Sequence, residues 1–243
     1  MPNPTAAMLV IGDEILSGRT RDANMHFLAK ELTRAGIDLC EARMISDKAD
    51  AITDATRTLA AQYTHVFTSG GIGPTHDDIT ADCIAAAFDT PIDIRADARA
   101  ILEAHYERSG TELNAARLRM ARIPDGASLI DNPISAAPGF TLENVHVMAG
   151  VPQIFEAMVA SVLPTLTGGA PLLSQTLRIN QGEGIIAGPL GELAAEFPDL
   201  SIGSYPFSHS GAFGSNIVIR GHDGARIDAA MQSLSRLFPD DAS

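Results

Sequence analysis

The most informative part of the chain reads HVFTSGGIGPTHDD, residues 65–78. Its first four residues have the apolar, aromatic and β-branched character of a short buried strand. The three glycines that follow permit positive backbone φ angles and a close approach of backbone N–H groups to a ligand. A helix is predicted next, from about Asp78 to Phe88. A strand, a glycine loop and a helix N-terminus in this order are typical of a binding site for an anionic group.

Strands and helices alternate along the first two thirds of the chain. A short apolar run predicts a buried strand, and apolar residues at i, i+3, i+4 and i+7 predict a helix. We predict strands at 6–11, 37–45, 65–68, 128–130 and 145–148, and helices at 25–35, 52–60, 78–88, 96–108 and 151–166. Ser46 or Asp47 would cap the second of these helices. This alternation predicts an α/β fold with a mostly parallel sheet and right-handed crossovers.

A linker, Thr-Gly-Gly-Ala-Pro at residues 167–171, separates this part from a smaller one. Beyond the linker we predict a small α+β unit. Its strands fall at 176–179, 200–205 and 216–220, and its helices at 190–197 and 227–238. The predicted domains are therefore 1–168 and 169–243.

The net charge is −13 over 243 residues. This balance argues against duplex DNA or an anionic membrane as a partner, since both require a basic surface. No segment approaches the roughly 20 apolar residues of a membrane span, and the N-terminus lacks the basic region of a signal peptide. Cys40 and Cys83 are too few for a disulfide framework or a zinc site. We expect a cytoplasmic protein that binds small anionic ligands and has no nucleic-acid or membrane partner.

Acidic residues follow two strands at the edge where ligands bind in open parallel sheets. If the first three strands are ordered 2-1-3, the loop at 12–18 and the glycine loop open onto one crevice. Asp13 and Glu14 would then lie close to Asp77 and Asp78. Carboxylates without a His or Cys cluster suit Mg²⁺ or a similar divalent metal that bridges phosphates.

These polar residues also have structural interpretations. Asp78 could be the N-cap of the helix that follows it, and Glu14 a solvated loop residue. His76 could position a ligand or shuttle protons, although a lone loop histidine is more often solvated. Asp22 and Asn24 could cap the first predicted helix or reach the crevice.

Four segments, taken in order, resemble the molybdopterin-binding (MoaB/Mog-like) domain family. The resemblance is to the branch found in the competence/damage-inducible protein CinA and at the front of eukaryotic FAD synthases. The segments are GDEILSGRTRDAN at 12–24, TSGGIGPTHDDIT at 68–80, NPISAAPGF at 132–140 and AGVPQIFEAM at 149–158. The unit after them resembles the small KH-like domain of CinA. The resemblance implies a three-layer α/β/α fold, a homo-oligomer (a dimer or a trimer), and no nicotinamide-nucleotide amidase domain.

The resemblance also implies a pocket for a pterin, such as molybdopterin, or for a nucleotide pyrophosphate. The candidate ligand-binding residues are Gly12, Ser69, Gly70, Gly71, Gly73, Thr75, Asn132, Pro138 and Gly139. The candidate catalytic residues are Asp13, Asp77 and Asp78, and the candidate metal ligands are Asp13, Glu14 and Asp78. In the pterin-adenylylating branch an arginine stands at the position of Asp77. The CinA-like branch has an aspartate there and is associated with metal-dependent cleavage of ADP-ribose-type pyrophosphates.

Two departures from the family pattern bear on the substrate. Ser135 stands where the family usually has glycine, and Ala136 where threonine is common, so the wall formed by residues 132–139 can differ. The KH-like unit lacks a basic GXXG loop, and residues 171–243 carry four Arg, no Lys and eight acidic residues, so RNA binding is not expected.

We therefore expect a divalent-metal-dependent nucleotide pyrophosphatase that acts on ADP-ribose- or FAD-like substrates. The first alternative is molybdopterin binding with adenylyl transfer in molybdenum-cofactor biosynthesis. The second is a non-catalytic, nucleotide-binding regulatory module.

Overall fold

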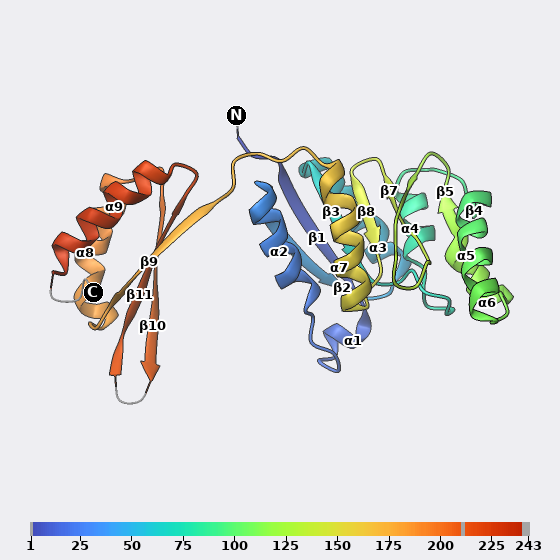
Figure 1. Cartoon of the computed structure of the whole chain (residues 1–243), viewed down its shortest axis with the longest axis horizontal. Helices are drawn as coiled ribbons and strands as arrows, with labels where there is room; N and C mark the ends of the chain where they lie inside the picture. Colours follow the sequence, from blue (N-terminus) through green and yellow to red (C-terminus); the bar gives the residue numbers. More distant parts are fainter. Residues whose placement is uncertain (1, 210–211, 240–243) are drawn as a thin grey trace. The chain divides into compact units, whose positions relative to one another are not determined.

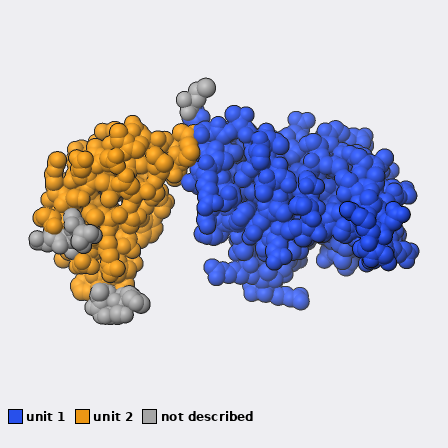
Figure 2. Space-filling model, viewed as in Figure 1, with its two compact units in different colours: residues 1–169 blue, residues 170–243 orange. Residues whose placement is uncertain are grey.

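The computed structural model describes residues 2–209 and 212–239. They belong to two compact units, Met1–Gly169 and Ala170–Ser243, shown in different colours in Figure 2. The unit boundary lies one residue beyond the boundary expected from the linker composition. Each unit has its own hydrophobic core, and each is described by itself below.

The first unit is built on a six-stranded sheet with the order β2-β1-β3-β8-β7-β6 (Figure 1). The strands are β1 Thr5–Ile11, β2 Asp38–Ile45, β3 His65–Ser69, β6 Ser128–Ile130, β7 Gly139–Leu142 and β8 Val145–Met148. The first four strands in that order run parallel, and β7 and β6 are antiparallel to their neighbours. The fold is therefore an α/β fold with a mostly parallel sheet, as predicted, and the first three strands have the order 2-1-3 on which the expected crevice depended.

Two helical layers cover the two faces of this sheet, and the central strand β1 shows why. Its odd-numbered residues Ala7, Leu9 and Ile11 belong to one buried cluster, together with residues of α3 Ala49–Gln62 and α4 Thr80–Ala87. Its even-numbered residues belong to a second cluster, with residues of α2 Asn24–Ala35 and α7 Pro152–Val162. Because successive side chains of a strand point to opposite faces, a continuous apolar strand requires such cover on both sides.

One further long helix and several short elements complete the first unit. They are α1 Asp13–Leu16, β4 Ile92–Ile94, α5 Ala96–Ser109, α6 Ala115–Leu118, the 3₁₀ turns at Arg119–Ala121 and Leu163–Thr165, and β5 Arg122–Pro124. Strands β4 and β5 form a separate antiparallel pair. In the described part of the chain, no helix is both long and apolar enough to cross a membrane.

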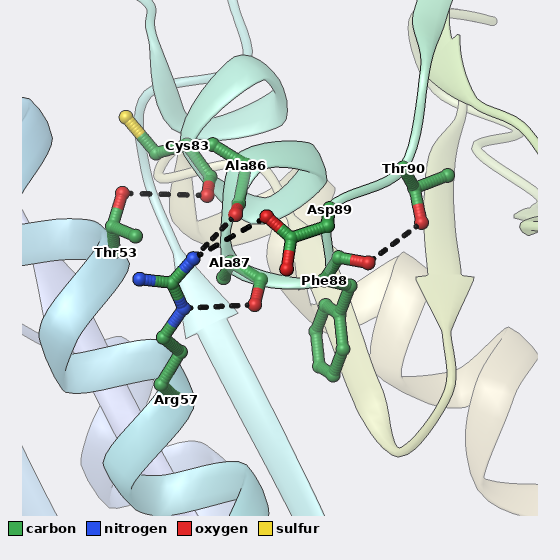
Figure 3. A network of polar contacts seen from close by, with 8 residues as sticks. All are labelled: Thr53, Arg57, Cys83, Ala86, Ala87, Phe88, Asp89 and Thr90. Carbon is green, nitrogen blue, oxygen red and sulfur yellow. Dashed lines mark hydrogen bonds and ion pairs between the residues drawn. The ribbon is translucent and has the colours of Figure 1, made fainter.

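Helix α4, which follows the glycine loop, is held at its far end by a cation from α3 (Figure 3). Arg57 donates from Nε to the carbonyl of Ala87 at 3.0 Å and from Nη2 to the carbonyl of Ala86 at 2.9 Å. Its Nη2 also lies 3.7 Å from Asp89 Oδ1. A guanidinium at a helix C-terminus satisfies carbonyls that lack helical partners and complements the helix dipole. The contact anchors α4 and thereby the loop before it.

The second unit has a three-stranded antiparallel sheet with the order β10-β11-β9. Its elements are β9 Leu173–Ile179, α8 Glu183–Glu196, β10 Ser201–His209, β11 Ala212–Gly221 and α9 Gly224–Leu237. All five predicted elements are present, but α8 begins at Glu183 rather than Leu190. Pro189 inside the helix and the glycines around it hid the helical pattern, and burial of Ile186 in the core favours the longer helix.

Candidate functional site

The glycine loop leaves β3 in a conformation that only glycine accepts without strain. Gly70 and Gly71 have φ angles of 111° and 70°. A Cβ at Gly70 would lie 2.3 Å from the carbonyl oxygen of Ile11, and one at Gly71 would lie 2.1 Å from the Thr80 hydroxyl. Both positions therefore require glycine for close approach as well as for positive φ. The loop is fixed against β1 on one side and against the start of α4 on the other.

Asp78 closes the glycine loop instead of capping α4. Its Oδ2 accepts hydrogen bonds from the backbone N–H of Thr75 at 2.8 Å and from the Thr75 hydroxyl at 2.5 Å. Helix α4 begins at Thr80, two residues after the predicted start near Asp78, and its N-cap position is Ile79, so the alternative that Asp78 is the N-cap is wrong. The same carboxylate lies against Gly73, where an added Cβ would be 2.7 Å from Oδ2. Asp78 thus combines a loop-closing role with a position beside the glycines.

The loop after β1 brings a further carboxylate to the same edge of the sheet. The backbone N–H of Asp13 donates to Asp47 Oδ2 at 2.8 Å. Asp47 follows β2, and the predicted capping of α3 by Ser46 or Asp47 is wrong, since the helix starts after Lys48 without a side-chain cap. The carboxylate of Glu14 lies above Gly12, within 2.6 Å of where a Cβ would be. The carboxyl ends of β1, β2 and β3 therefore all contribute acidic groups.

Asn24 connects three segments beneath these loops. It is 4% exposed, and its Nδ2 donates to Ser69 Oγ at 2.7 Å and to the carbonyl of Gly150 at 2.8 Å. Its Oδ1 is buried without a hydrogen-bond partner. For Asp22 the structural alternative fits the contacts: its Oδ2 accepts a hydrogen bond from the N–H of Met25, in the first turn of α2, at 3.1 Å. Asn24 is thus an internal link between α2, β3 and the loop after β8.

An open cavity of about 560 Å³ lies at this edge of the sheet. Its polar part is lined by Gly12, Glu14, Thr20, Asp47, Gly70, Gly71, Gly73, Asp77, Asp78, Asn132, Ser135 and Gly150. Its apolar part is lined by Ile11, Ile72, Pro74, Met120, Ala137, Ala149, Val151, Pro152 and Ile154. The volume is that of a site for a small organic ligand, and the lining combines apolar side chains with a smaller number of charged and polar ones, as in most such sites.

The structure brings most of the candidate residues to this cavity, but not all of them. Asp13 is not among its lining residues, and Asp47 occupies the place expected for it. Ser69 lines a smaller adjoining cavity of about 60 Å³, and Pro138 lines another of about 20 Å³. Thr75 acts through Asp78, as described above. At Gly139 an added Cβ would lie 2.4 Å from the carbonyl oxygen of Val147, so this glycine serves the packing of β7 on β8.

The loop at residues 132–139 is organised by Asn132, which is 3% exposed. Its Nδ2 donates to Ser135 Oγ at 2.7 Å and to the carbonyl of Ala137 at 2.8 Å, while its Oδ1 accepts from the N–H groups of Ile134 and Ser135. The positive φ of this loop, 63°, falls at Ala136 and not at Ser135. Ser135 is therefore accommodated without backbone strain, and its hydroxyl is part of the wall.

The cavity is strongly acidic. Glu14, Asp47, Asp77 and Asp78 line it, and no Lys, Arg or His stands among the described residues of its wall. The Thr75 hydroxyl, above all, lowers the pKa of Asp77. His76 is a solvated loop residue with a side chain that is 99% exposed. Within residues 2–209 and 212–239, no three His, Cys, Asp or Glu side chains are grouped so as to hold a metal ion by themselves.

Sequence analysis missed two basic residues beside the glycine loop, Arg119 and Arg122. Arg119, in the 3₁₀ turn before β5, donates from Nη2 to the backbone carbonyl of Asp78 at 3.4 Å, and its buried Nε has no partner. It lines the cavity of about 20 Å³ that Gly71, Gly73 and Asp78 share with the main one. No sequence signal marked this arginine, because 41 residues separate it from its partner.

Fold and site together define a class: three-layer α/β proteins with a ligand cavity at the carboxyl edge of a parallel sheet, closed by a glycine loop. Within this class the chain belongs to the family described as "Probable molybdopterin binding domain", whose model matches residues 7–168. Residues 171–243 match the model described as "FAD synthase, middle domain".

Curated relatives extend this result. A protein of Archaeoglobus fulgidus is 34% identical over 199 residues, which cover 82% of this chain and 84% of that protein. A "Probable FAD synthase" of Caenorhabditis elegans is 31% identical across 96% of this chain but only 50% of its own length. A "CinA-like protein" of Citrifermentans bemidjiense is 39% identical over 67% of this chain and 40% of its own length.

A solved structure supports the fold of the first unit. The crystal structure of the protein CinA from Thermoplasma acidophilum, described as of unknown function, has a TM-score of 0.62 and 31% identity to this chain. The match covers 68% of this chain and 99% of that one. The similarity to CinA and the MoaB/Mog-like character of the fold, both expected from the four motifs, are confirmed.

Proposed function

We propose that the protein is a divalent-metal-dependent nucleotide pyrophosphatase that acts on ADP-ribose- or FAD-like substrates. The observation that carries this proposal is the charge of the cavity: four carboxylates line it, and among the described residues no basic side chain does. The carboxylates of this wall would repel a pyrophosphate group unless a cation lies between them and neutralises both the carboxylates and the phosphates. The same acidity disfavours a site that binds phosphates through arginine or lysine.

The carboxylates fit a cation that is shared with the substrate. Mg²⁺ keeps several waters and is commonly bound by one or two carboxylates together with substrate phosphates, so it needs no complete cage of protein ligands. Glu14, Asp47, Asp77 and Asp78 are the groups that would hold it, with Asp47 in the place first expected for Asp13. Once bound, a divalent cation would polarise a phosphoryl oxygen and lower the pKa of a bound water.

The chain's own residues would bind and orient the rest of the substrate. The Gly70 N–H already donates to the carbonyl of Met148 at 3.1 Å, so the backbone N–H groups of Gly71, Ile72 and Gly73, which also line the cavity, would donate to phosphate oxygens. Asp77, which lines the cavity, would orient the attacking water and accept its proton. The apolar wall, including Met120, Val151 and Ile154, would cover a base or a flavin-like ring.

Names of relatives agree with a nucleotide substrate. A relative over 96% of this chain is named a probable FAD synthase, and the second unit matches a domain named for the same enzyme. FAD is itself a pyrophosphate of adenosine and a flavin nucleotide, so a pocket for such a molecule fits either synthesis or hydrolysis. The absence of basic lining residues favours hydrolysis with metal over transfer to a pterin phosphate. The family description favours pterin binding, but the acidic lining of the cavity does not favour adenylyl transfer to a pterin phosphate.

The test is a turnover screen of ADP-ribose, FAD and NAD with Mg²⁺, Mn²⁺, Co²⁺ or Ni²⁺, followed by EDTA. The variant Asp78→Asn keeps an oxygen that accepts from Thr75 but removes the charge, so we expect an intact loop and turnover lowered at least a hundredfold. Asp125→Asn, an exposed aspartate whose side chain makes no hydrogen bond, is the matched control. Undiminished hydrolysis by a folded Asp78→Asn variant would contradict the proposal.

A regulatory module without catalysis is the second candidate. Its support is that the Asp78 carboxylate is engaged within its own loop and that, in the part of the chain that the structure describes, no three acidic groups are placed so as to hold a metal ion by themselves. The same screen separates the two candidates. A binding module would show a higher unfolding temperature with ADP-ribose or FAD, by ligand linkage, and no product with any of the metals.

A further inference from the structure

The second unit separates its charges between its sheet and its helices. Residues 170–243 contain eight acidic residues and four arginines, but β9, β10 and β11 contain no Asp, Glu or Lys. Two of the four arginines, Arg178 and Arg220, are in these strands. In a chain with a net charge of −13, an acid-free sheet that carries arginines is a local exception.

Strand register places both arginines on the sheet face that faces away from the helices. Ile179, Ile217 and Ile219 point into the core formed with α8 and α9, and Figure 1 shows both helices on one side of this sheet. Because side chains alternate along a strand, the neighbouring positions point to the other side. We call this side the outer face; its main residues are Thr176, Arg178, Tyr205, Phe207, Val218 and Arg220.

The arginines of the outer face are held by aromatic rings and not by carboxylates. The guanidinium carbon of Arg178 lies 3.9 Å from the centre of the Phe207 ring. Arg220 donates from Nη2 to the Tyr205 hydroxyl at 3.2 Å. Neither arginine forms an ion pair with any described residue, whereas Arg226 in α9 binds Asp199 through two nitrogens at 3.0 and 2.7 Å. The outer face therefore presents two cations without counter-charges.

Glycines allow the aromatic rings to lie across the strands. An added Cβ at Gly203 would lie 3.2 Å from the Tyr205 ring, and one at Gly214 would lie 2.2 Å from the carbonyl oxygen of Ile179 and 2.8 Å from the Phe207 ring. The rings thus occupy the space left by missing side chains and support the guanidinium groups above the sheet. Stacking restricts the arginine side chains, so less conformational entropy is lost when their N–H groups bind an anion.

We propose that the outer face is a docking surface for an extended, acidic segment of a partner protein. Arg220 stands opposite Ser174, which is four residues from Arg178 along β9. At about 3.4 Å per residue, the two arginine positions are roughly 13 Å apart along the strands. An extended segment presents side chains at i and i+4 on one side with the same spacing. Two carboxylates at that spacing would each pair with one guanidinium, and apolar atoms between them would contact Val218 and Tyr205.

Other occupants fit the outer face less well. Three strands of this length cover only a few hundred Å², whereas a stable dimer buries about 800 Å² per partner. A twofold contact of the outer face with a second copy would also bring like charges together. Single-stranded nucleic acid needs a groove with many cations, and the outer face has two, on a unit with twice as many acidic residues as arginines.

The test uses the full chain and a fluorescein-labelled dodecapeptide with glutamate at alternate positions and serine between them. Fluorescence anisotropy should show binding that weakens with added salt. Arg178→Gln and Arg220→Gln should each weaken binding by about tenfold, since each removes a charge-assisted pair. Arg236→Gln removes the same charge from the exposed side of α9 and should change binding by less than about twofold. Circular dichroism should show that all three variants remain folded.

Four results would overturn the proposal. The first is equal binding of a peptide with glutamine in place of glutamate, and the second is unchanged binding by the Arg178→Gln, Arg220→Gln double variant. The third is tighter binding of a uridine dodecanucleotide that depends on the same arginines, which would assign the outer face to nucleic acid. The fourth is a dimer, seen by sedimentation, that the double variant dissociates.

Discussion

His146 provides the sharpest test of the first unit's interior. It lies in β8 and is 2% exposed. Its Nδ1 is 2.9 Å from the Thr141 hydroxyl and its Nε2 is 3.2 Å from His65 Nδ1, while its ring packs on Phe67 with centres 4.8 Å apart. Burial, with a smaller contribution from the charge of His65, lowers the pKa of His146 to about 3. The folded protein therefore keeps this imidazole neutral.

A neutral buried histidine makes stability depend on pH in a defined direction. The unfolded chain protonates His146 below about pH 6.5, but the folded protein does so only near pH 3. Between these values the unfolded state binds more protons, so stability is lost as the pH falls. At about 1.4 kcal/mol per pH unit, lowering the pH from about 7.5 to about 5 costs about 2 kcal/mol from this residue alone.

The assay compares the wild type with His146→Gln, which can still hydrogen-bond but cannot be charged. Urea unfolding followed by circular dichroism at both pH values gives the change in free energy of unfolding for each protein. Groups other than His146 contribute to both changes, so the difference between them isolates His146, and we expect the wild type to lose about 2 kcal/mol more. Equal losses would refute the reasoning. So would an NMR titration in which the histidine signal absent from the variant shows an ordinary pKa near 6.5.

Three further predictions concern the loop and its supports. Gly71→Ala should lower the free energy of unfolding by about 3 kcal/mol, because the added Cβ would clash with the Thr80 side chain. The control Gly110→Ala also has a positive φ but open space around the Cβ, and it should lower the free energy of unfolding by only about 1 kcal/mol. Equal losses for the two variants would contradict the clash with Thr80. Arg119→Met removes the hydrogen bond to the Asp78 carbonyl and should raise about fivefold the Mn²⁺ concentration that is needed to stabilise the protein against thermal unfolding. An unchanged Mn²⁺ titration would exclude this positioning role. Arg57→Met removes two hydrogen bonds from the C-terminus of α4 and should lower the free energy of unfolding, measured by chemical denaturation, by about 1–2 kcal/mol. An unchanged free energy of unfolding would show that the contact does not stabilise α4.

The family and the general place of the site could be predicted from the sequence, because both depend on local signals. The apolar run of β1 and the glycine loop after β3 are each a continuous stretch of sequence. The alternation of strands and helices between them implies parallel strands whose carboxyl ends meet at one edge of the sheet. The same rule could have identified Asp47, which follows β2 at that edge. A carboxylate just before a helix is most often a cap, and for this reason the sequence favours a capping role for Asp47.

The sequence by itself determined the order of the elements, the division into two units and the set of acidic residues near the glycine loop. Only the tertiary structure decided which of them reach the cavity. It replaced Asp13 by Asp47, engaged Asp78 within its own loop, and placed Arg119 beside that loop. It also gathered the arginines of β9 and β11 onto one face. These outcomes depend on side-chain direction and on contacts between residues far apart in the chain, and neither follows from periodicity or composition.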